Sequence, residues 1–275
     1  MDMSRSISDY LRRIGADRPP VPDAAALRDL QFRHLLTVPF ENLSIHLGEE
    51  IVLEDAALVA KVVERRRGGF CYELNGAFAT LLRGLGFRVT LLQARVFTPD
   101  GGLGIPYDHL ALLVETPAPN GTGPGEGRRR WLADVGFGSH HSYPLAFDER
   151  GDQDDPAGTF RVVEAPDGDL DVLRDGKPQL RIDRRPRVLA DFTAGSWYHR
   201  TSPDSPFTRS LVCSRNTRDG RITLTGDRLV TTVNGERHER ELVGDAEVLA
   251  AYLEHFGLDL DEVPQVMAGR TRGRS

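Results

Sequence analysis

The chain has 275 residues, of which 39% are hydrophobic and 28% charged, and this composition is typical of a soluble globular protein. Its formal net charge of −6 argues against nucleic acid or an anionic membrane as the main partner, because both require a basic face. No signal sequence and no apolar run of about 18 residues occurs, so no membrane span is expected. Two cysteines, Cys71 and Cys213, are too few for a secreted disulfide scaffold, and a cytoplasmic location is expected.

Helical periodicity dominates the first third of the chain. Asp23 is expected to cap a helix that ends at Pro39, and a second helix is expected over residues 55–66, with Gly68 as its left-handed end. A third helix is expected over residues 74–85. The residues that share the buried faces of these helices are Leu27, Leu30 and His34, then Leu58, Val59, Val62 and Val63, then Leu74, Phe78, Leu81, Leu82 and Leu85.

After the third helix the apolar period changes to two, which predicts antiparallel strands and a small barrel or sandwich. The expected strands cover residues 88–97, 109–115, 130–135, 159–164, 210–214, 222–226, 229–233 and 236–243. Residues 117–130 are rich in Pro, Gly and Arg and are expected to form an exposed hairpin loop. Asn234 and Gly235 predict a type I′ hairpin turn, and a last helix is expected from its cap at Asp245 to Gly257. The buried face of this last helix is expected to comprise Val248, Leu249, Tyr252, Leu253 and Phe256.

The segment RGGFCYELN, residues 67–75, places Cys71 in or beside the first turn of the third helix. The free N–H groups and the dipole at a helix N-terminus favour a thiolate, so the pKa of Cys71 is expected to be lowered. Such a thiol would suit nucleophilic catalysis. The alternative is a small buried core residue, which is the common role of a free cysteine.

A thiolate nucleophile needs a base and a group that orients the base. His109 begins one apolar strand, and Asp134 lies near the end of another. Pairing them would fix the imidazole tautomer and stabilise the imidazolium that forms when Cys71 loses its proton. For Asp134, capping of the backbone at a turn is the alternative role. The Gly-Phe-Gly segment at 136–138 permits close approach of the backbone to a ligand, although a plain turn would explain it equally well.

Beyond these residues, five segments in order carry a family resemblance: LLTVPFENL, RGGFCYELNGAF, HLALLV, WLADVGFG and SPFTRSLVCSR. They extend from about Leu35 to Val233, and with them the chain resembles the arylamine N-acetyltransferases. The resemblance implies an α+β fold with a papain-like or transglutaminase-like cysteine-protease core. An N-terminal helical domain (1–87), a central antiparallel β-barrel (88–195) and a C-terminal α/β lid (196–275) are therefore expected.

The resemblance also implies a mechanism. The catalytic triad would be Cys71, His109 and Asp134, acting by ping-pong transfer through an acetyl-cysteine. The acyl donor would be acetyl-CoA, as a substrate and not as a bound cofactor, and the acceptor would be a small aromatic amine or hydrazine. The residues expected to line the substrate or CoA pocket are Phe70, Gly136, Phe137, Gly138 and Phe207.

Other residues are expected to be structural. A salt bridge between Arg67 and Glu41 is expected to hold the helical domain together. Cys213 is expected to be inert packing in a strand. No metal is expected, because His140 and His141 lack accompanying ligands at metal-site spacing.

Three alternative functions remain at this point. A macrolactam-forming amide synthase would use the same triad on a polyketide thioester, a cysteine hydrolase would use the same core, and a non-enzymatic binding module would keep only the fold. The sequence leaves open the acceptor amine, the acyl-chain preference, and whether the role is xenobiotic metabolism or biosynthesis. No heptad or apolar stripe defines an oligomeric state, so a homo-oligomer is left open.

Overall fold

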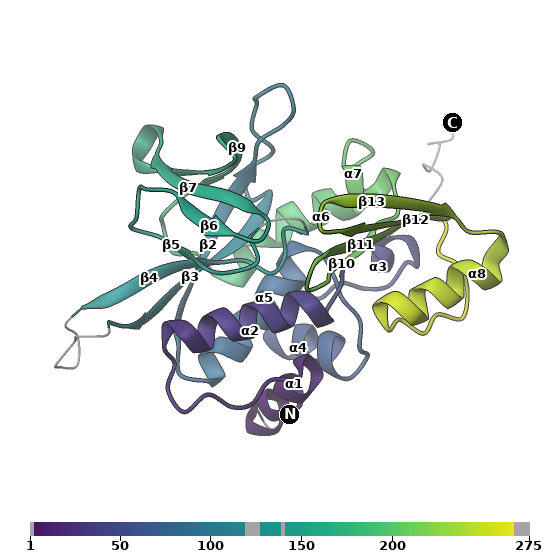
Figure 1. The fold of residues 1–275 in the computed structure, drawn as a ribbon, viewed down its shortest axis with the longest axis horizontal. Helices are drawn as coiled ribbons and strands as arrows, with labels where there is room; N and C mark the ends of the chain where they lie inside the picture. Colours follow the sequence, from purple (N-terminus) through teal and green to yellow (C-terminus); the bar gives the residue numbers. More distant parts are fainter. Residues whose placement is uncertain (1–2, 119–126, 139–140, 267–275) are drawn as a thin grey trace, which may run out of the picture.

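The computed structural model describes residues 3–118, 127–138 and 141–266 (Figure 1). The N-terminal helices lie along one side of the molecule, beneath a strongly curved sheet and a second, C-terminal sheet (Figure 1). This arrangement confirms the predicted α+β architecture. The boundaries expected between the three domains stay a prediction. In the described residues no helix is long and apolar enough to cross a membrane.

The helices of the N-terminal part are α1 (Met3–Ile14), α2 (Ala24–Thr37), α3 (Leu43–His46), α4 (Asp55–Val63) and α5 (Cys71–Gly84). The sequence analysis missed α1, although Ile7, Leu11 and Ile14 follow helical spacing and are buried. Helix α2 begins where predicted, because the Asp23 carboxylate accepts a hydrogen bond of 2.8 Å from the N–H of Ala26.

The end of α4 differs from the prediction. The helix ends at Val63, and the left-handed residue after it is Arg66 (φ 53°), so the prediction of a left-handed Gly68 is wrong. Gly68 is required for another reason: a Cβ there would lie 1.9 Å from the carbonyl oxygen of Pro39. The chain packs this closely because the segment after α2 and the segment before α5 run side by side at this point.

The curved sheet is antiparallel throughout, with strand order β5-β4-β3-β2-β9-β8-β7-β6, and forms a nearly closed barrel. Its strands are β2 (Arg88–Val96), β3 (His109–Pro117), β4 (Arg128–Ala133), β5 (Leu145–Ala146), β6 (Gln153–Asp155), β7 (Gly158–Glu164), β8 (Leu170–Arg174) and β9 (Lys177–Ile182). The sequence analysis missed β5, β6, β8 and β9. Strands β3 and β4 pair as the predicted hairpin, and most of its loop, residues 119–126, lies outside the described residues.

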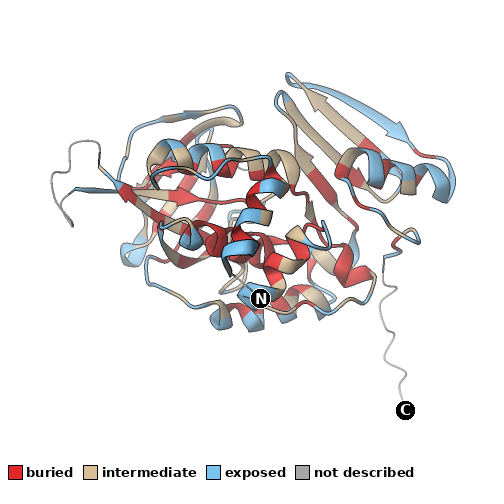
Figure 2. Cartoon of the chain, turned by 90° about the horizontal axis from the view of Figure 1, so that it is seen from below, coloured by how far each residue is buried: buried red, intermediate tan, exposed pale blue. Residues whose placement is uncertain are grey.

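The C-terminal sheet has the order β1-β10-β11-β12-β13. Its strands are β1 (Phe40–Glu41), β10 (Cys213–Asn216), β11 (Gly220–Thr225), β12 (Arg228–Val233) and β13 (Glu236–Glu241). Because β1 comes from the helical part of the chain, this sheet is tied to it by backbone pairing. The type I′ turn is confirmed by positive φ at both Asn234 (50°) and Gly235 (86°). Strand β13 is exposed along its whole length and charged, which protects this free edge from further pairing (Figure 2).

The remaining helical segments are η1 (Pro166–Gly168), η2 (Leu189–Phe192), α6 (Thr193–Thr201), α7 (Pro206–Arg209), α8 (Gly244–Ala251) and η3 (Tyr252–Phe256). The predicted cap at Asp245 is wrong, because this residue lies inside the first turn of α8. The predicted burial of Leu253 is also wrong, since its side chain is 54% exposed. Here the helix widens into the π-helical turn η3, which changes the face that each residue occupies. The predicted end at Gly257 is confirmed by its left-handed φ of 68°.

Candidate active site

Cys71 is the first residue of α5, as the sequence predicted to within one turn. The Glu73 side chain accepts a hydrogen bond of 3.2 Å from the N–H of Phe70 and so stabilises the start of the helix. The N–H groups of Cys71 and Tyr72 lie in the first turn, where amides have no acceptor within the helix. These two amides are therefore candidates for binding an oxyanion beside the sulfur.

His109 and Asp134 come together at neighbouring ends of the paired strands β3 and β4. The His109 Nε2 lies 2.6 Å from the Asp134 Oδ2, and both side chains are buried. His109 also forms a hydrogen bond with the Cys71 thiol, and its Nδ1 is the ring nitrogen left for this contact. The structure thus aligns thiol, imidazole and carboxylate in the order that the sequence predicted.

Asn75 holds Asp134 and the neighbouring backbone of the barrel in place by hydrogen bonds. The sequence analysis did not assign this role to it. Its Nδ2 donates to Asp134 Oδ1 (2.8 Å) and to the carbonyl of Leu110 (2.6 Å), and its Oδ1 accepts from the N–H of Val135 (2.9 Å). Asn75 follows Cys71 by four residues on the same helix, so both project toward the barrel. That spacing was the available signal, but the sequence could not show that the barrel supplies its partners.

The charges of the site depend on burial and on the neighbouring groups. Burial by itself would lower the pKa of His109, but the charge and hydrogen bond of Asp134 raise it overall to about 10. Burial raises the pKa of the Cys71 thiol above its ordinary value, although His109 opposes that shift. The predicted lowering of the Cys71 pKa by the helix N-terminus is therefore wrong, because desolvation outweighs it. Proton transfer from the thiol depends on His109.

A cavity of about 440 Å³ opens above the sulfur, between the barrel and the segments α6 and α7. Its wall combines polar groups near the sulfur with four phenylalanines. The lining residues include Phe40, Cys71, Val96, Phe97, Gly104, Asp108, His109, Gly136, Phe137, His199 and Phe207. The Phe137 ring stands edge-on to His109, with ring centroids 5.4 Å apart, and both rings line the cavity.

Three of the five predicted pocket residues, Gly136, Phe137 and Phe207, line this cavity. Gly136 must be glycine, because a Cβ would lie 2.7 Å from the Cα of Cys71. Phe70 is fully buried behind the wall, with its ring 5.9 Å from that of Phe207. Gly138 lies at the outer end of the turn, with a φ of 87°. Whether these residues contact a substrate stays a prediction.

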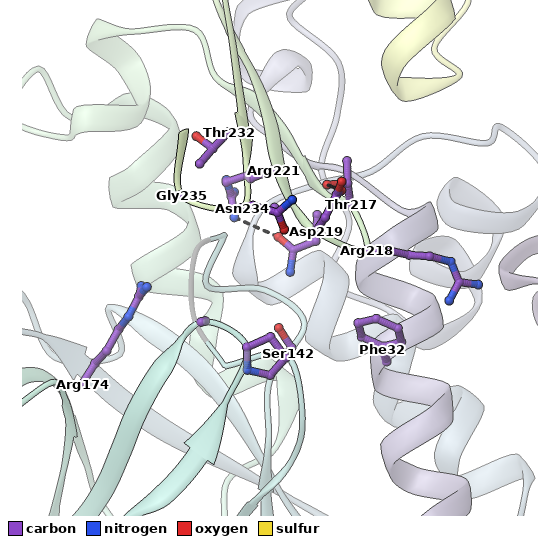
Figure 3. Close-up of a pocket in the computed structure, with 14 residues that line it drawn as sticks. Phe32, Ser142, Arg174, Thr217, Arg218, Asp219, Arg221, Thr232, Asn234 and Gly235 are labelled. Atoms are coloured by element: carbon purple, nitrogen blue, oxygen red, sulfur yellow. Dashed lines mark hydrogen bonds between the residues drawn. The ribbon is translucent and has the colours of Figure 1, made fainter. Parts of the chain in front are cut away.

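A second cleft, of about 510 Å³, lies between the barrel and the C-terminal sheet and is lined by neither Cys71 nor His109 (Figure 3). Arg174 enters it from β8 and Arg221 from β11 (Figure 3). Arg221 donates to the carbonyl of Gly138, so it supports the turn that carries Phe137. Burial lowers the pKa of Arg221 to about 10, and the charge of Arg174 adds to this shift.

Two buried ion pairs hold the helical part beneath the site. The predicted bridge between Arg67 and Glu41 is confirmed at 3.0 Å, and Glu49 is a second partner of Arg67 at 2.8 Å. Lys61 and Glu73 form the other pair, at 2.6 Å. Because Glu73 also supports the first turn of α5, these contacts position the helix that carries the nucleophilic candidate.

The described residues contain no group of three or more His, Cys, Asp or Glu side chains placed to hold a metal ion. His140, one of two adjacent histidines considered in the sequence, lies outside them. His141 is buried, and its Nδ1 lies 2.6 Å from the carbonyl oxygen of Tyr143. Cys213 is completely buried in β10. The sequence analysis expected it to be an inert packing residue in a strand.

Comparison with known proteins agrees with the geometry. A family model described as N-acetyltransferase matches residues 23–266. The arylamine N-acetyltransferase of Mycolicibacterium smegmatis is 34% identical over 275 residues, which cover 98% of this chain and 96% of the relative. The arylamine N-acetyltransferase of Escherichia coli is 32% identical, over 94% of this chain and 91% of the relative.

Solved structures extend the agreement to the fold. The M. smegmatis arylamine N-acetyl transferase matches with a TM-score of 0.82 at 34% identity, over 92% of each chain. A Mycobacterium marinum arylamine N-acetyltransferase, solved in complex with CoA, matches with a TM-score of 0.80 at 30% identity, over 92% of this chain and 93% of that one. Sequence and fold agree over nearly the whole length, and the chain belongs to the arylamine N-acetyltransferase family of acyltransferases.

Proposed function

We propose that the protein transfers the acetyl group of acetyl-CoA to arylamines, arylhydrazines or hydrazides through an acetyl group carried on Cys71. The observation that supports this best is the contact series from the Cys71 thiol through His109 to Asp134 on the wall of an aromatic cavity. A thiol, a base and an orienting carboxylate are the parts needed for covalent acyl transfer.

In the first half-reaction, Cys71 reacts as a thiolate paired with the protonated imidazole of His109, which Asp134 stabilises. The thiolate attacks the thioester carbonyl, and the N–H groups of Cys71 and Tyr72 stabilise the oxyanion. When the tetrahedral intermediate collapses, its C–S bond to CoA breaks, and the CoA sulfur takes the proton from His109. The products are free CoA and acetyl-Cys71.

In the second half-reaction, the acceptor amine attacks the acetyl carbonyl and His109 removes a proton from its nitrogen. The bond to Cys71 breaks, the thiolate and the protonated His109 are restored, and the acetylated amine leaves. Phe137 and Phe207 cover the site with apolar surface, which favours an aromatic amine over water as the acceptor. The names of the relatives and the CoA complex of one of them point to the same two substrates.

The test is to incubate the purified protein with acetyl-CoA alone, record its intact mass and map any modified residue. One acetyl group on Cys71, discharged by adding an arylamine, is the expected result. A Cys71→Ala variant should take up none, whereas Cys213→Ala should still be acetylated. If the wild-type protein releases no CoA and stays unmodified, acetyl-CoA is the wrong donor, and carrier-bound polyketide thioesters become the substrates to examine. Rapid loss of the acetyl group to water without an amine would instead favour a hydrolase.

A further inference from the structure

A largely buried carboxylate that the mechanism does not use lies in the wall of the acyl cavity. Asp108 directly precedes His109, and its side chain is 12% exposed. Its Oδ2 accepts a hydrogen bond of 3.0 Å from the N–H of Val96, and a Cβ on Gly104 would lie 2.2 Å from the same oxygen. Since Val96 and Gly104 both line the cavity, the carboxylate itself is part of that wall.

The other oxygen of Asp108 faces His199 of α6. The Asp108 Oδ1 lies 3.1 Å from the His199 Nε2, but the two atoms are not aligned as a hydrogen bond. The His199 Nδ1 lies 3.3 Å from the Ser205 hydroxyl oxygen, and the ring packs edge-on against Phe207. In the described part of the chain no lysine or arginine lies within 4.0 Å of Asp108, and His199 is the basic side chain beside this carboxylate.

This placement adds a negative charge beside the nucleophile. Burial is the main cause of the raised pKa of the Cys71 thiol, and the negative charge of Asp108 adds a smaller contribution in the same direction. The carbonyl oxygen of Asp108 also lies 3.9 Å from the Cys71 sulfur, so the residue adjoins the reacting atom. A carboxylate with no lysine or arginine beside it is costly in a cavity wall unless a ligand compensates its charge.

We propose that Asp108, which lies beside His199, is the acceptor subsite for a positively charged or N–H-donating group on the amine substrate. The inference rests on the proposed acetyl transfer and narrows its acceptor class. Aromatic rings of the cavity hold the aromatic part of the acceptor, and Asp108 favours cationic or donor-bearing amines and hydrazides while repelling carboxylate-bearing ones.

The test uses enzyme that has first been acetylated on Cys71, so that only the acceptor step is measured. Three anilines that differ in the para substituent serve as acceptors: 4-(aminomethyl)aniline, 4-methylaniline and 4-aminobenzoate. With Asp108→Asn, the rate constant for the cationic aniline relative to the methyl compound should fall about tenfold, and that for the anionic aniline should rise about tenfold. Comparing variant with wild type for each compound cancels differences in intrinsic nucleophilicity.

Asp171→Asn is the matched control. Asp171 has a similarly buried side chain, 14% exposed, and pairs with Arg181 on the barrel, but it does not line the cavity. In Asp171→Asn, the rate constants for the cationic and anionic anilines, each relative to the methyl compound, should stay within about twofold of the wild-type values. This is expected for a charge outside the site. Unchanged ratios in Asp108→Asn would overturn the inference. Failure of the wild type to acetylate Cys71 would instead overturn the proposed function, before any acceptor is added.

A measurement on the wild-type protein covers the case in which Asp108→Asn does not fold. Benzylammonium, toluene and benzoate are unreactive analogues of the three acceptors, and each is tested for protection of Cys71 against iodoacetamide. Benzylammonium should protect at a concentration about tenfold lower than benzoate. Equal protection by the cation and the anion would contradict the subsite.

Discussion

The two cysteines of the chain have nearly the same burial but different surroundings. Cys71 is 3% exposed and Cys213 is 0% exposed, and burial raises the pKa of both thiols. Cys71 has a hydrogen bond to His109 and lies on a cavity, whereas Cys213 pairs across the sheet with Glu41, whose charge raises its pKa further. A proton acceptor and an open approach, not a low intrinsic pKa, therefore distinguish the proposed nucleophile from the packing cysteine.

Removal of the Cys71 sulfur is expected to have the largest effect on activity. Cys71→Ala should lower kcat/KM for acetyl transfer by at least about 10⁴-fold, because the acetyl group has no carrier. Cys213→Ala should keep kcat/KM within about twofold and lose about 1 kcal/mol in the free energy of unfolding. Steady-state kinetics and urea unfolding of both variants check this. A comparable loss of activity in Cys213→Ala would contradict its assignment to packing.

The next prediction tests whether the reactivity of Cys71 depends on His109 as its proton acceptor. Asp134→Asn should lower kcat by about 10³- to 10⁴-fold, because the amide cannot stabilise the imidazolium of His109. Iodoacetamide labelling should show Cys71 becoming as slow to react as Cys213 in this variant. If Cys71 still reacts at the wild-type rate, its reactivity does not depend on the pair of His109 and Asp134.

A smaller effect is expected for Asn75, because its side chain only positions the Asp134 carboxylate. Asn75→Ala should lower kcat by about 10- to 100-fold with little change in KM. It should also cost about 1–3 kcal/mol in the free energy of unfolding, because buried partners lose their hydrogen bonds. Thr80→Ala is the control on the same helix: its hydroxyl donates to the carbonyl of Gly76 and touches none of the three site residues. An equal loss of kcat in both variants would mean that general loosening of α5 is responsible.

The last prediction is a slope in stability against pH of at most about 1.4 kcal/mol per pH unit. The pKa of His109 is raised from 6.5 to about 10 in the folded protein, so its contribution is fully present below pH 6.5. Stability should decline as the pH rises from about 6.5 through about 10, because the unfolded chain releases this proton first. Asp134→Asn should flatten the slope, which chemical unfolding at a series of pH values would show. An identical slope in both proteins would place the titration elsewhere.

Local patterns predicted the main parts of the site. The helical period after Cys71 and the apolar strands around His109 and Asp134 placed each residue at the correct end of its element. The same reasoning missed α1 and strands β8 and β9, and misplaced the left-handed turn that Arg66 makes. The helical spacing of α1 was visible in the sequence, whereas β8, β9 and the turn at Arg66 are short or charged segments, in which local preferences are weak and packing against the rest of the chain decides.

Residues whose importance depends on remote partners could not be found in this way. Asp108 and His199 are 91 positions apart in the printed sequence, and neither lies in a motif that points to the other. Asn75 had a visible place on the helix but no visible partner in the barrel. Hydrogen bonds and charges act over a few ångströms, so only the folded arrangement reveals these contacts.

The sequence by itself determined the family, the change from helices to strands along the chain, and which thiol, imidazole and carboxylate could act together. Periodicity, turns and caps are local, and the five family segments are read directly from the chain. The tertiary structure alone decided how far Cys71 is removed from water, that its pKa is raised and not lowered, and that Asp108 faces the same cavity. Desolvation and charge interactions depend on every group that surrounds an atom, and those groups come from all three parts of the fold.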